Sequence, residues 1–345
     1  MEIKFIYDRW DHHSGHSGYD IMVPFLGEPL PSIDYKDKKA RIVPWRVATR
    51  FVHHRVGMRH YAHHHFYAEL TAVFDMFKSK NTIYHVMEGD FGYRHLGKFS
   101  GFKGNRVVAT YHLPPKRLAD DIHSFKHLDQ LSAIFVVGKN QLSFFEPHVQ
   151  PDKLHWVPLG IDTEYFHPVP SRQRSGTKQC LFVGRHMRDL ETLKGVVERL
   201  AADDELDVKT VLVTDQAGKE MFAGIQGVDA RVRIPEEELL DLYQQSDLLL
   251  LPLFDATAVI ALLESLACGL PIVSTNIGAV PDYVDDTCAK LAPPQDPEAM
   301  YAAVRTLLTD EQRLCEMSEN ARQKALKYDW SEIVRIMRDI YSQIL

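Results

Sequence analysis

The sequence predicts an α/β protein made of two doubly wound units, each a parallel sheet with helices on its faces. Two series of short β-rich runs alternate with helical stretches, one before residue 165 and one after residue 178. Most runs lack polar alternation, which is typical of strands covered on both faces. Ligands of such folds lie beyond the carboxyl ends of the strands, so we expect a site in a cleft between the units.

The individual runs set the domain organisation. The first series is 3–7, 82–87, 106–115, 133–138 and 154–160, and the second is 179–185, 208–214, 232–234, 247–253 and 271–275. Apolar spacings of three and four over 311–345 predict two amphipathic helices. We therefore expect an N-terminal domain (1–165), a C-terminal domain (166–325), and a last helix (326–345) that packs back on the N-terminal domain.

Composition excludes several classes of protein. With 345 residues, 45% apolar and 25% charged, the chain resembles an ordinary globular protein. No apolar run reaches the roughly 18–20 residues of a membrane-spanning helix, and the N-terminus has no signal-peptide pattern, so we expect a cytoplasmic location. The four cysteines show no C-x-x-C spacing, which indicates neither a disulfide framework nor a zinc site.

Charge and histidine are unevenly distributed along the chain. Residues 1–165 carry 21 Lys and Arg against 18 Asp and Glu, and subtraction from the totals of 40 and 47 leaves 19 against 29 for the remainder. The first 165 residues also hold 16 of the 18 histidines. We therefore expect pH-sensitive or substrate-facing chemistry in this half.

The stretch DATAVIALLESLACGLPIVS places two acids around the start of a predicted helix. A helix from about Val259 to Cys268 would end at Gly269, a residue suited to a helix C-terminus. Asp255 and Thr257 precede it and are expected to cap it, leaving N–H groups and a positive dipole end for an anion. The alternative is that Asp255 is only a cap and Glu264 a solvated helix residue.

The longer string DLLLLPLFDATAVIALLESLACGLPIVSTNIGAVPDYV (247–284) resembles the signature of glycosyltransferase family 4, retaining enzymes of the GT-B fold. The resemblance covers about residues 80–340 and implies two Rossmann-like domains facing across a cleft, an N-terminal acceptor-binding domain (1–165) and a C-terminal nucleotide-sugar-binding domain (166–325). Glu264 stands at the second Glu of the family's Glu-x7-Glu helix, which implies that it binds the ribose hydroxyls of a nucleotide sugar. The first Glu, which contacts the donor sugar, would fall at Ala256, so Asp255 beside it is a candidate replacement.

A second motif, FVGRHMRDLETLKGV (182–196), resembles the family's Gly-Arg strand end, where two cations hold the leaving diphosphate. Arg185 fits the first cation, whereas the usual Lys five residues later is Leu190. Arg188 is the expected substitute, since a guanidinium can grip phosphate bidentately. The alternative is a surface pair between Arg188 and Asp189.

Other residues complete the expected donor site. The segment 8–20 has two glycines where the family places a turn near the donor phosphates, and 234–252 resembles the segment that meets the base. The donor-binding candidates are Gly15, Gly18, Ile234, Asp255, Thr257, Ala258, Val259 and Glu264. Histidines 12, 13 and 16 have no zinc-like spacing, and because cationic side chains and helix ends can neutralise a diphosphate, we expect neither a metal nor another cofactor.

The N-terminal half supplies the expected acceptor side. His112 follows a predicted strand and precedes two prolines that fix the loop, and the resemblance implies that it contacts the donor sugar or the acceptor. Glu88 and Asp90 follow another strand and are expected to approach the acceptor or to hold His112. His16 is assigned to the same side. A loop-structuring histidine is the alternative for His112.

A basic stretch suggests a partner. Residues 36–59 contain eight Lys and Arg against only Asp37, interleaved with Trp45 and Phe51. Such a segment can bind anionic lipid headgroups at the inner face of a membrane, but a solvated basic face or a patch for an anionic soluble acceptor explains it equally well. Nucleic acid is not expected, because the chain is acidic overall and has no recognised module.

The expected function is a metal-independent, retaining glycosyltransferase of the hexosyltransferase type. It would move a sugar from a nucleoside diphosphate donor, a UDP-sugar in the first instance, to a hydroxyl of a glycan, glycolipid or small molecule. Arg185 and Arg188 would stabilise the departing diphosphate electrostatically. The alternatives are a phosphorylase or epimerase on the same fold, and a non-catalytic sugar-nucleotide-binding protein, which the missing first Glu and missing Lys favour.

Overall fold

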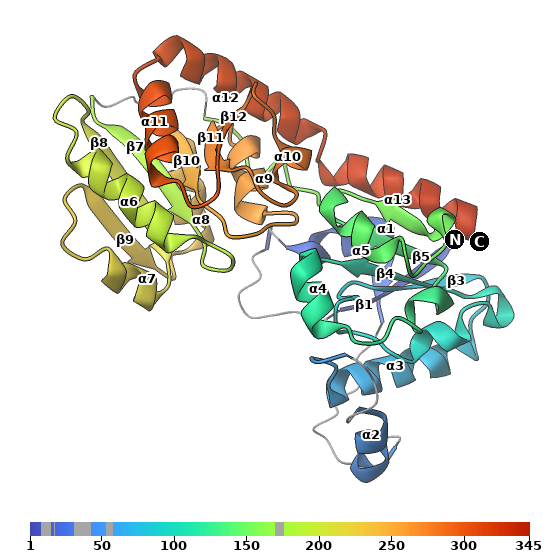
Figure 1. Cartoon of the computed structure of the whole chain (residues 1–345). Helices are drawn as coiled ribbons and strands as arrows, with labels where there is room; N and C mark the ends of the chain where they lie inside the picture. Colours follow the sequence, from blue (N-terminus) through green and yellow to red (C-terminus); the bar gives the residue numbers. More distant parts are fainter. Residues whose placement is uncertain (8–14, 17, 31–42, 53–57, 170–175) are drawn as a thin grey trace. The chain divides into compact units, whose positions relative to one another are not determined.

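The computed structural model describes residues 1–7, 15–16, 18–30, 43–52, 58–169 and 176–345 (Figure 1). The chain forms two compact units, one of Met1–Leu159 with Ser331–Leu345 and one of Gly160–Trp330. Within the part of the chain that is described, no helix is both long and apolar enough to cross a membrane.

The N-terminal unit contains a six-stranded parallel sheet in the order β2-β1-β3-β4-β5-β6. Its strands are β1 (Glu2–Ile6), β2 (Glu28–Pro29), β3 (Thr82–Val86), β4 (Arg106–Tyr111), β5 (Ala133–Val136) and β6 (Leu154–Trp156). Its α-helices are α1 (Val23–Leu26), α2 (Trp45–Val52), α3 (His63–Met76), α4 (Pro115–Asp121), α5 (Leu142–Phe145) and α13 (Trp330–Ile344). Strands β3 (TIYHV) and β5 (AIFV) are buried throughout, which is why their sequences show no regular alternation of polarity.

Helix α13 belongs to this unit although it lies at the end of the chain (Figure 1). Its apolar stripe includes the buried Ile333, Met337 and Tyr341. The Tyr341 hydroxyl lies 2.6 Å from Nδ1 of His85 on β3, and Nε2 of His85 lies 2.7 Å from Oγ1 of Thr110 on β4. A buried polar chain thus fixes α13 to two central strands. Burial lowers the pKa of His85 to about 3, so its ring is neutral.

The C-terminal unit contains a second six-stranded parallel sheet, in the order β12-β11-β10-β7-β8-β9. Its strands are β7 (Lys178–Val183), β8 (Val208–Thr214), β9 (Val228–Val232), β10 (Leu248–Leu251), β11 (Ile272–Thr275) and β12 (Ala289–Ala292). Its α-helices are α6 (Leu190–Ala201), α7 (Gln216–Met221), α8 (Glu236–Gln245), α9 (Ile260–Ala267), α10 (Val280–Tyr283), α11 (Pro297–Leu308) and α12 (Glu311–Leu326). The four leucines of β10 are fully buried.

Two sequence expectations are corrected in this unit. The strand predicted at 232–234 lies at 228–232, because β9 is an edge strand whose sequence VDARV alternates in polarity and hides the apolar signal. Helix α9 begins after Val259, which has no side-chain oxygen, so Asp255 and Thr257 lie before the N-cap and do not occupy it. Its end agrees with the prediction, since Gly269 follows with φ 66°.

Candidate functional site

Glu264 occupies the middle of α9 and is only 4% exposed, so it is not the solvated helix residue of the alternative interpretation. The Tyr243 hydroxyl of α8 donates a hydrogen bond of 2.7 Å to Oε2 of Glu264. Both side chains are buried, and the pKa of Tyr243 is raised well above its ordinary value by burial and by the charge of Glu264. A buried carboxylate held in this way is preorganised to accept hydroxyl donors.

Arg188 lies beside this pair in the loop that follows β7. Its Nε donates to the Val183 carbonyl at 2.9 Å and its Nη1 to the His186 carbonyl at 3.0 Å. Gly184 permits this approach, because a β-carbon there would lie 2.8 Å from Nη2 of Arg188 and φ of Gly184 is 104°. Burial lowers the pKa of Arg188 to about 10, while the charges of Tyr243 and Glu264 oppose that shift, so the guanidinium remains a cation near Glu264.

Asp189 does not form the surface pair with Arg188 that the alternative interpretation expected. Asp189 is the N-cap of α6, and its carboxylate accepts the Thr192 N–H at 3.0 Å and the Thr192 hydroxyl at 2.7 Å. It is 2% exposed. The buried cap fixes the start of α6 and therefore the loop that carries both arginines.

Arg185 has a different environment in the same loop. Its side chain is 73% exposed, and Nη1 lies 3.6 Å from Oδ2 of Asp215. Asp215 also caps α7 by accepting the Gly218 N–H at 2.8 Å. Because such an exposed ion pair contributes little to stability, Arg185 can exchange Asp215 for an anionic ligand at low cost.

The segment between β10 and α9 is fixed by the loop that follows β11. The Ala256 carbonyl accepts the Ala279 N–H at 3.0 Å, and a β-carbon on Gly278, whose φ is 55°, would lie 2.2 Å from the same carbonyl oxygen. Oδ1 of Asp255 accepts the Ala256 N–H at 2.8 Å. Ala256 is 3% exposed, and its methyl group offers no hydrogen bond to a sugar, which leaves Asp255 as the neighbouring acid.

The remaining donor candidates are distributed along the same unit. Thr257 and Val259 are buried, whereas Ala258 is partly buried. Ile234 is partly buried and precedes α8, after Arg233, which has φ 52°. Gly15 and Gly18 belong to the other unit, where Gly18 has φ 142° and precedes the 3-10 helix η1 (Tyr19–Met22).

His112 follows the carboxyl end of β4 and is 9% exposed. Its Nε2 lies 2.8 Å from the Met87 carbonyl, so Nε2 carries the proton and Nδ1 is the acceptor nitrogen. The ring stacks on Tyr19, with ring centroids 3.7 Å apart. Burial lowers the pKa of His112 to about 4, so the imidazole is neutral near pH 7 and can accept, but not supply, a proton.

Asp90 holds the backbone of the His112 loop. Its carboxylate accepts the N–H groups of His112, at 3.0 and 3.2 Å, and of Leu113, at 3.0 Å. Asp90 is 3% exposed, and burial raises its pKa to about 6 despite these bonds. Asp90 was predicted either to approach the acceptor or to hold His112, and in the structure it holds the His112 backbone. Glu88 is partly buried. The pKa of Tyr19 is raised mainly by burial, and further by the negative charges of Asp90 and Glu88.

Sequence reasoning missed two residues on this side. Tyr19 was not singled out, although it stacks on His112. Gln141 is fully buried and joins two strand ends, since its Nε2 donates to the carbonyls of Tyr111 and Leu113 and its Oε1 accepts the N–H groups of residues 137 and 138. The Tyr that follows a glycine-rich turn was the available signal for Tyr19, whereas nothing local identifies Gln141.

The histidine and basic segments lie partly outside the described residues. His12 and His13 are outside them, whereas His16 is described and partly buried. Among the described residues, no three His, Cys, Asp or Glu side chains could hold a metal ion together. Lysines 36, 38 and 39 and arginines 41 and 55 also lie outside; α2 carries Arg46 and Arg50 together with the exposed Trp45, Val47 and Phe51.

Comparison with known proteins identifies similar chains. Residues 177–310 match the family model described as glycosyl transferases group 1. The chain is 26% identical over 205 residues to an MMP alpha-(1->4)-mannosyltransferase of Mycolicibacterium hassiacum, covering 57% of this chain and 50% of that protein. It is 25% identical over 243 residues to a D-inositol 3-phosphate glycosyltransferase of Corynebacterium kroppenstedtii, covering 63% and 54%. The chain thus spans about half the length of the curated relatives it matches.

Solved structures match over the whole chain. A sucrose-phosphate synthase from Thermosynechococcus elongatus superposes with a TM-score of 0.74 at 16% identity, covering 100% of this chain and 99% of that one. Anabaena HepE in complex with UDP and glucose gives 0.71 at 13% identity, covering 99% and 100%. These likenesses confirm the predicted GT-B fold class, with two six-stranded parallel sheets.

Proposed function

We propose that this chain, which belongs to the glycosyl transferases group 1 family through its C-terminal unit, is a retaining glycosyltransferase that uses a nucleoside diphosphate sugar. The observation that carries the proposal is the buried Glu264, held by the Tyr243 hydroxyl and accompanied by the Arg188 cation. A carboxylate suits ribose hydroxyls, and a guanidinium suits a diphosphate. Neither group needs a metal ion for these tasks.

The chemistry follows from where charge develops. As the bond between the anomeric carbon and the diphosphate breaks, negative charge grows on the leaving oxygens, and Arg185 and Arg188 are the cations placed at the end of β7 to stabilise it. The acceptor hydroxyl forms the new bond at the anomeric carbon, and its proton passes to an oxygen of the departing diphosphate. The neutral His112 is our proposed contact to the donor sugar or the acceptor.

UDP is our proposed nucleotide, and a sugar or phosphorylated polyol hydroxyl our proposed acceptor. The support is that Anabaena HepE was crystallised with UDP and glucose, and that the similar enzymes carry the names mannosyltransferase and D-inositol 3-phosphate glycosyltransferase. For this chain we infer from these names only that the donor carries a hexosyl group and that the acceptor is polar.

An anionic membrane surface is the further partner that we propose. Helix α2 combines Arg46 and Arg50 with Trp45, Val47 and Phe51, each of these three at least 39% exposed. Aromatic rings suit the interfacial region of a bilayer, and each arginine near anionic headgroups contributes about 1 kcal/mol. Vesicles with and without phosphatidylserine, tested with wild type and with Arg46→Gln/Arg50→Gln, would show charge-dependent binding, whereas equal binding would exclude this partner.

The first experiment is a panel of UDP-, GDP- and ADP-sugars incubated with the purified protein, with donor hydrolysis and donor binding both measured. Hydrolysis of one donor that is lost in Arg185→Ala is the expected result. Hydrolysis that persists unchanged in Arg185→Ala would contradict the assignment of the phosphate-binding cations, because contaminating hydrolases would then explain it.

A second candidate function is sugar-nucleotide binding without turnover. Two observations favour it: Ala256 replaces the first acid of the family motif, and two nitrogens of Arg188 are engaged with backbone carbonyls. The same panel separates the two functions, since a donor that binds to wild type but is neither hydrolysed nor transferred supports the non-catalytic one.

A further inference from the structure

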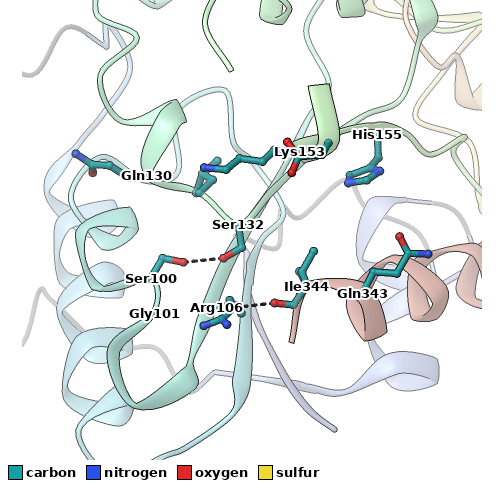
Figure 2. Close-up of a pocket in the computed structure, with 11 residues that line it drawn as sticks. Ser100, Gly101, Arg106, Gln130, Ser132, Lys153, His155, Gln343 and Ile344 are labelled. Carbon is teal, nitrogen blue, oxygen red and sulfur yellow. Dashed lines mark hydrogen bonds between the residues drawn. The ribbon is translucent and has the colours of Figure 1, made fainter. Parts of the chain in front are cut away.

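A polar cavity of about 640 Å³ opens at the amino ends of β4, β5 and β6 in the N-terminal unit (Figure 2). Strand residues Arg106 and His155, the preceding residues Ser132 and Lys153, Ser100, and Ile344 of α13 line it. Glu88, Asp90 and His112 follow the carboxyl ends of β3 and β4, which is the opposite edge of the same parallel sheet. The cavity is therefore separate from the acceptor side of the proposed reaction, and its volume is typical of small-molecule sites.

Arg106 lies at the edge of this cavity, and hydrogen bonds from two of its three guanidinium nitrogens hold it there. Its Nε donates to the Ile344 carbonyl at 2.7 Å (Figure 2), and its Nη1 donates to the carbonyls of residues 104 and 105 at 3.3 Å. These bonds fix the orientation of the side chain. Nη2, with two N–H donors, is the nitrogen left for a ligand.

Two serine hydroxyls are fixed beside Arg106. Oγ of Ser100 and Oγ of Ser132 lie 2.8 Å apart (Figure 2), and Oγ of Ser100 also accepts the Val107 N–H at 3.1 Å. The pair shares one hydrogen bond, which uses one of its two hydroxyl hydrogens. Whichever serine donates, the other hydroxyl hydrogen remains for an acceptor atom of a ligand.

The cavity has an excess of positive charge. Lys153 uses one N–H to bond the Asp129 carbonyl at 2.9 Å, and within the described part of the chain neither Lys153 nor Arg106 forms an ion pair. His155 is partly buried, and burial lowers its pKa, so its ring is neutral near pH 7. Asp152, an exposed residue, is the acid among the lining residues. Two cations and several N–H and O–H donors thus face one exposed carboxylate.

We propose that this cavity is a second ligand site, which binds a small phosphate monoester such as a phosphorylated sugar or polyol. The phosphate oxygens accept from Arg106 Nη2, from Lys153 and from the serine pair, which matches the strong preference of a guanidinium for phosphate. The polyol part occupies the rest of the volume, where the amides of Gln130 and Gln343 meet its hydroxyls. The site goes beyond the proposed transferase activity and does not depend on it.

Ligand binding is coupled to the docking of α13. The last turn of this helix lines the cavity and is tied to Arg106, and one turn earlier Tyr341 bonds His85 in the core. A ligand that neutralises Arg106 and contacts Gln343 stabilises the docked helix, because it binds the docked state preferentially. The amides of 330–344 should therefore exchange hydrogen more slowly when the site is occupied.

The test is calorimetric titration of the whole protein with D-glucose 6-phosphate, inorganic phosphate and D-glucose, together with hydrogen exchange of α13. We expect the ester to bind most tightly, inorganic phosphate more weakly, and glucose not at all. Arg106→Gln should weaken binding of the ester at least about tenfold, and Lys153→Gln several-fold. Lys116→Gln, at an exposed residue of α4, which follows the carboxyl end of β4 at the opposite edge of the sheet, and Arg185→Ala should both bind as wild type does.

Lys153→Gln keeps the test meaningful if Arg106→Gln fails to fold, since Lys153 has one surface bond to lose. No binding up to about 10 mM, or wild-type affinity in both cavity variants, would overturn the site. Equal affinity for glucose would overturn the phosphate assignment, and equal affinity for inorganic phosphate would overturn the ester. Loss of binding in Arg185→Ala would move the ligand to the proposed reaction site.

Discussion

The two units share a six-stranded parallel sheet but handle ionisable groups in opposite ways. The N-terminal unit buries them singly: His85, His112 and His127 have pKa values lowered to between about 3 and 4, and Glu69 has a pKa raised to about 7, all mainly by burial. Two of these groups bond backbone or hydroxyl partners: Glu69 accepts the N–H groups of residues 94–96, and His85 bonds the hydroxyls of Thr110 and Tyr341.

The C-terminal unit keeps most of its charges at the surface and in pairs. Asp229 with Arg231, Asp203 with Arg305, and Asp285 with Lys324 are examples. The candidate donor site of this unit combines the buried Glu264 with the partly buried Arg188. The difference teaches that the candidate donor site has fixed charges, whereas the proposed acceptor side contains histidines whose protonation in acid opposes folding.

The largest expected effect concerns the two arginines of the candidate donor site. Arg185→Ala and Arg188→Ala should each lower donor turnover at least about 100-fold, near 3 kcal/mol of transition-state stabilisation. Only Arg188→Ala should also lower the melting temperature, because its guanidinium bonds the Val183 and His186 carbonyls whereas Arg185 is mostly exposed. Lys194→Ala is the matched control and should keep wild-type turnover. A loss with Lys194→Ala as large as with Arg188→Ala would mean that Lys194 is the second cation.

The next expected effect is a difference between the two units in how their stability depends on pH. A histidine with a folded pKa near 3 or 4 and an unfolded pKa near 6.5 withdraws stability as the pH falls below 6.5, because the unfolded state binds more protons. Glu69 and Asp90, whose pKa values are raised, act in the opposite direction. Between about pH 6 and pH 4.5, three histidines oppose two acids, a net loss of about 1.4 kcal/mol per pH unit.

The C-terminal unit should resist this acidification. Lys324 lowers the pKa of Asp285 to about 2, so the stability from this pair is present above pH 3.8 and is lost only as the pH falls towards 2. Hydrogen exchange, corrected for its intrinsic pH dependence, should show β3 and β4 losing protection before β7 and β10 between pH 6.5 and 4.5. His85→Gln, which cannot take up a proton, should reduce the difference. Simultaneous loss in both sheets would contradict the comparison.

A smaller effect tests the one buried pair of the donor side. Tyr243→Phe removes the hydroxyl that donates to Glu264 and leaves a buried carboxylate with one partner fewer. The free energy of unfolding should fall by about 1–3 kcal/mol, and donor affinity should fall with it. Tyr301→Phe, at a partly buried bond to Asp203 in the same unit, is the control and should cost less. If chemical denaturation showed the same loss in the free energy of unfolding for both variants, burial of the Tyr243–Glu264 pair would add nothing to its contribution to stability.

Local sequence patterns were enough to predict most strands of the two sheets, whereas the roles of the candidate donor residues stay predictions. Apolar runs without alternation located β7, β8, β10 and β11, because a strand buried on both faces is apolar throughout. The patterns failed for β9, an edge strand, and for the two-residue β2. The motif around Glu264 gave its position, since the acid, the glycine and the proline lie close together in the chain.

The partners of these residues could not be read from the sequence. Tyr243 and Glu264 are 21 residues apart, and Asp90 and His112 are 22 apart, so only tertiary packing brings them together. The capping role predicted for Asp255 failed for a local reason: its carboxylate bonds the next N–H of its own loop before the helix begins. Sequence therefore predicted which residue types lie in the donor unit but not which of them hold one another.

The smallest effect concerns the acid that stands beside the missing first Glu. Asp255→Asn keeps an oxygen to accept the Ala256 N–H and removes the negative charge, so the fold should be unchanged. If Asp255 contacts the donor sugar, affinity for the sugar nucleotide should fall by about 0.5–1.5 kcal/mol, while affinity for the nucleoside diphosphate alone stays the same. Titration with both ligands measures the difference. Equal losses for the two ligands would place Asp255 near the phosphates instead, and no loss would leave the sugar to the backbone N–H groups at the start of α9.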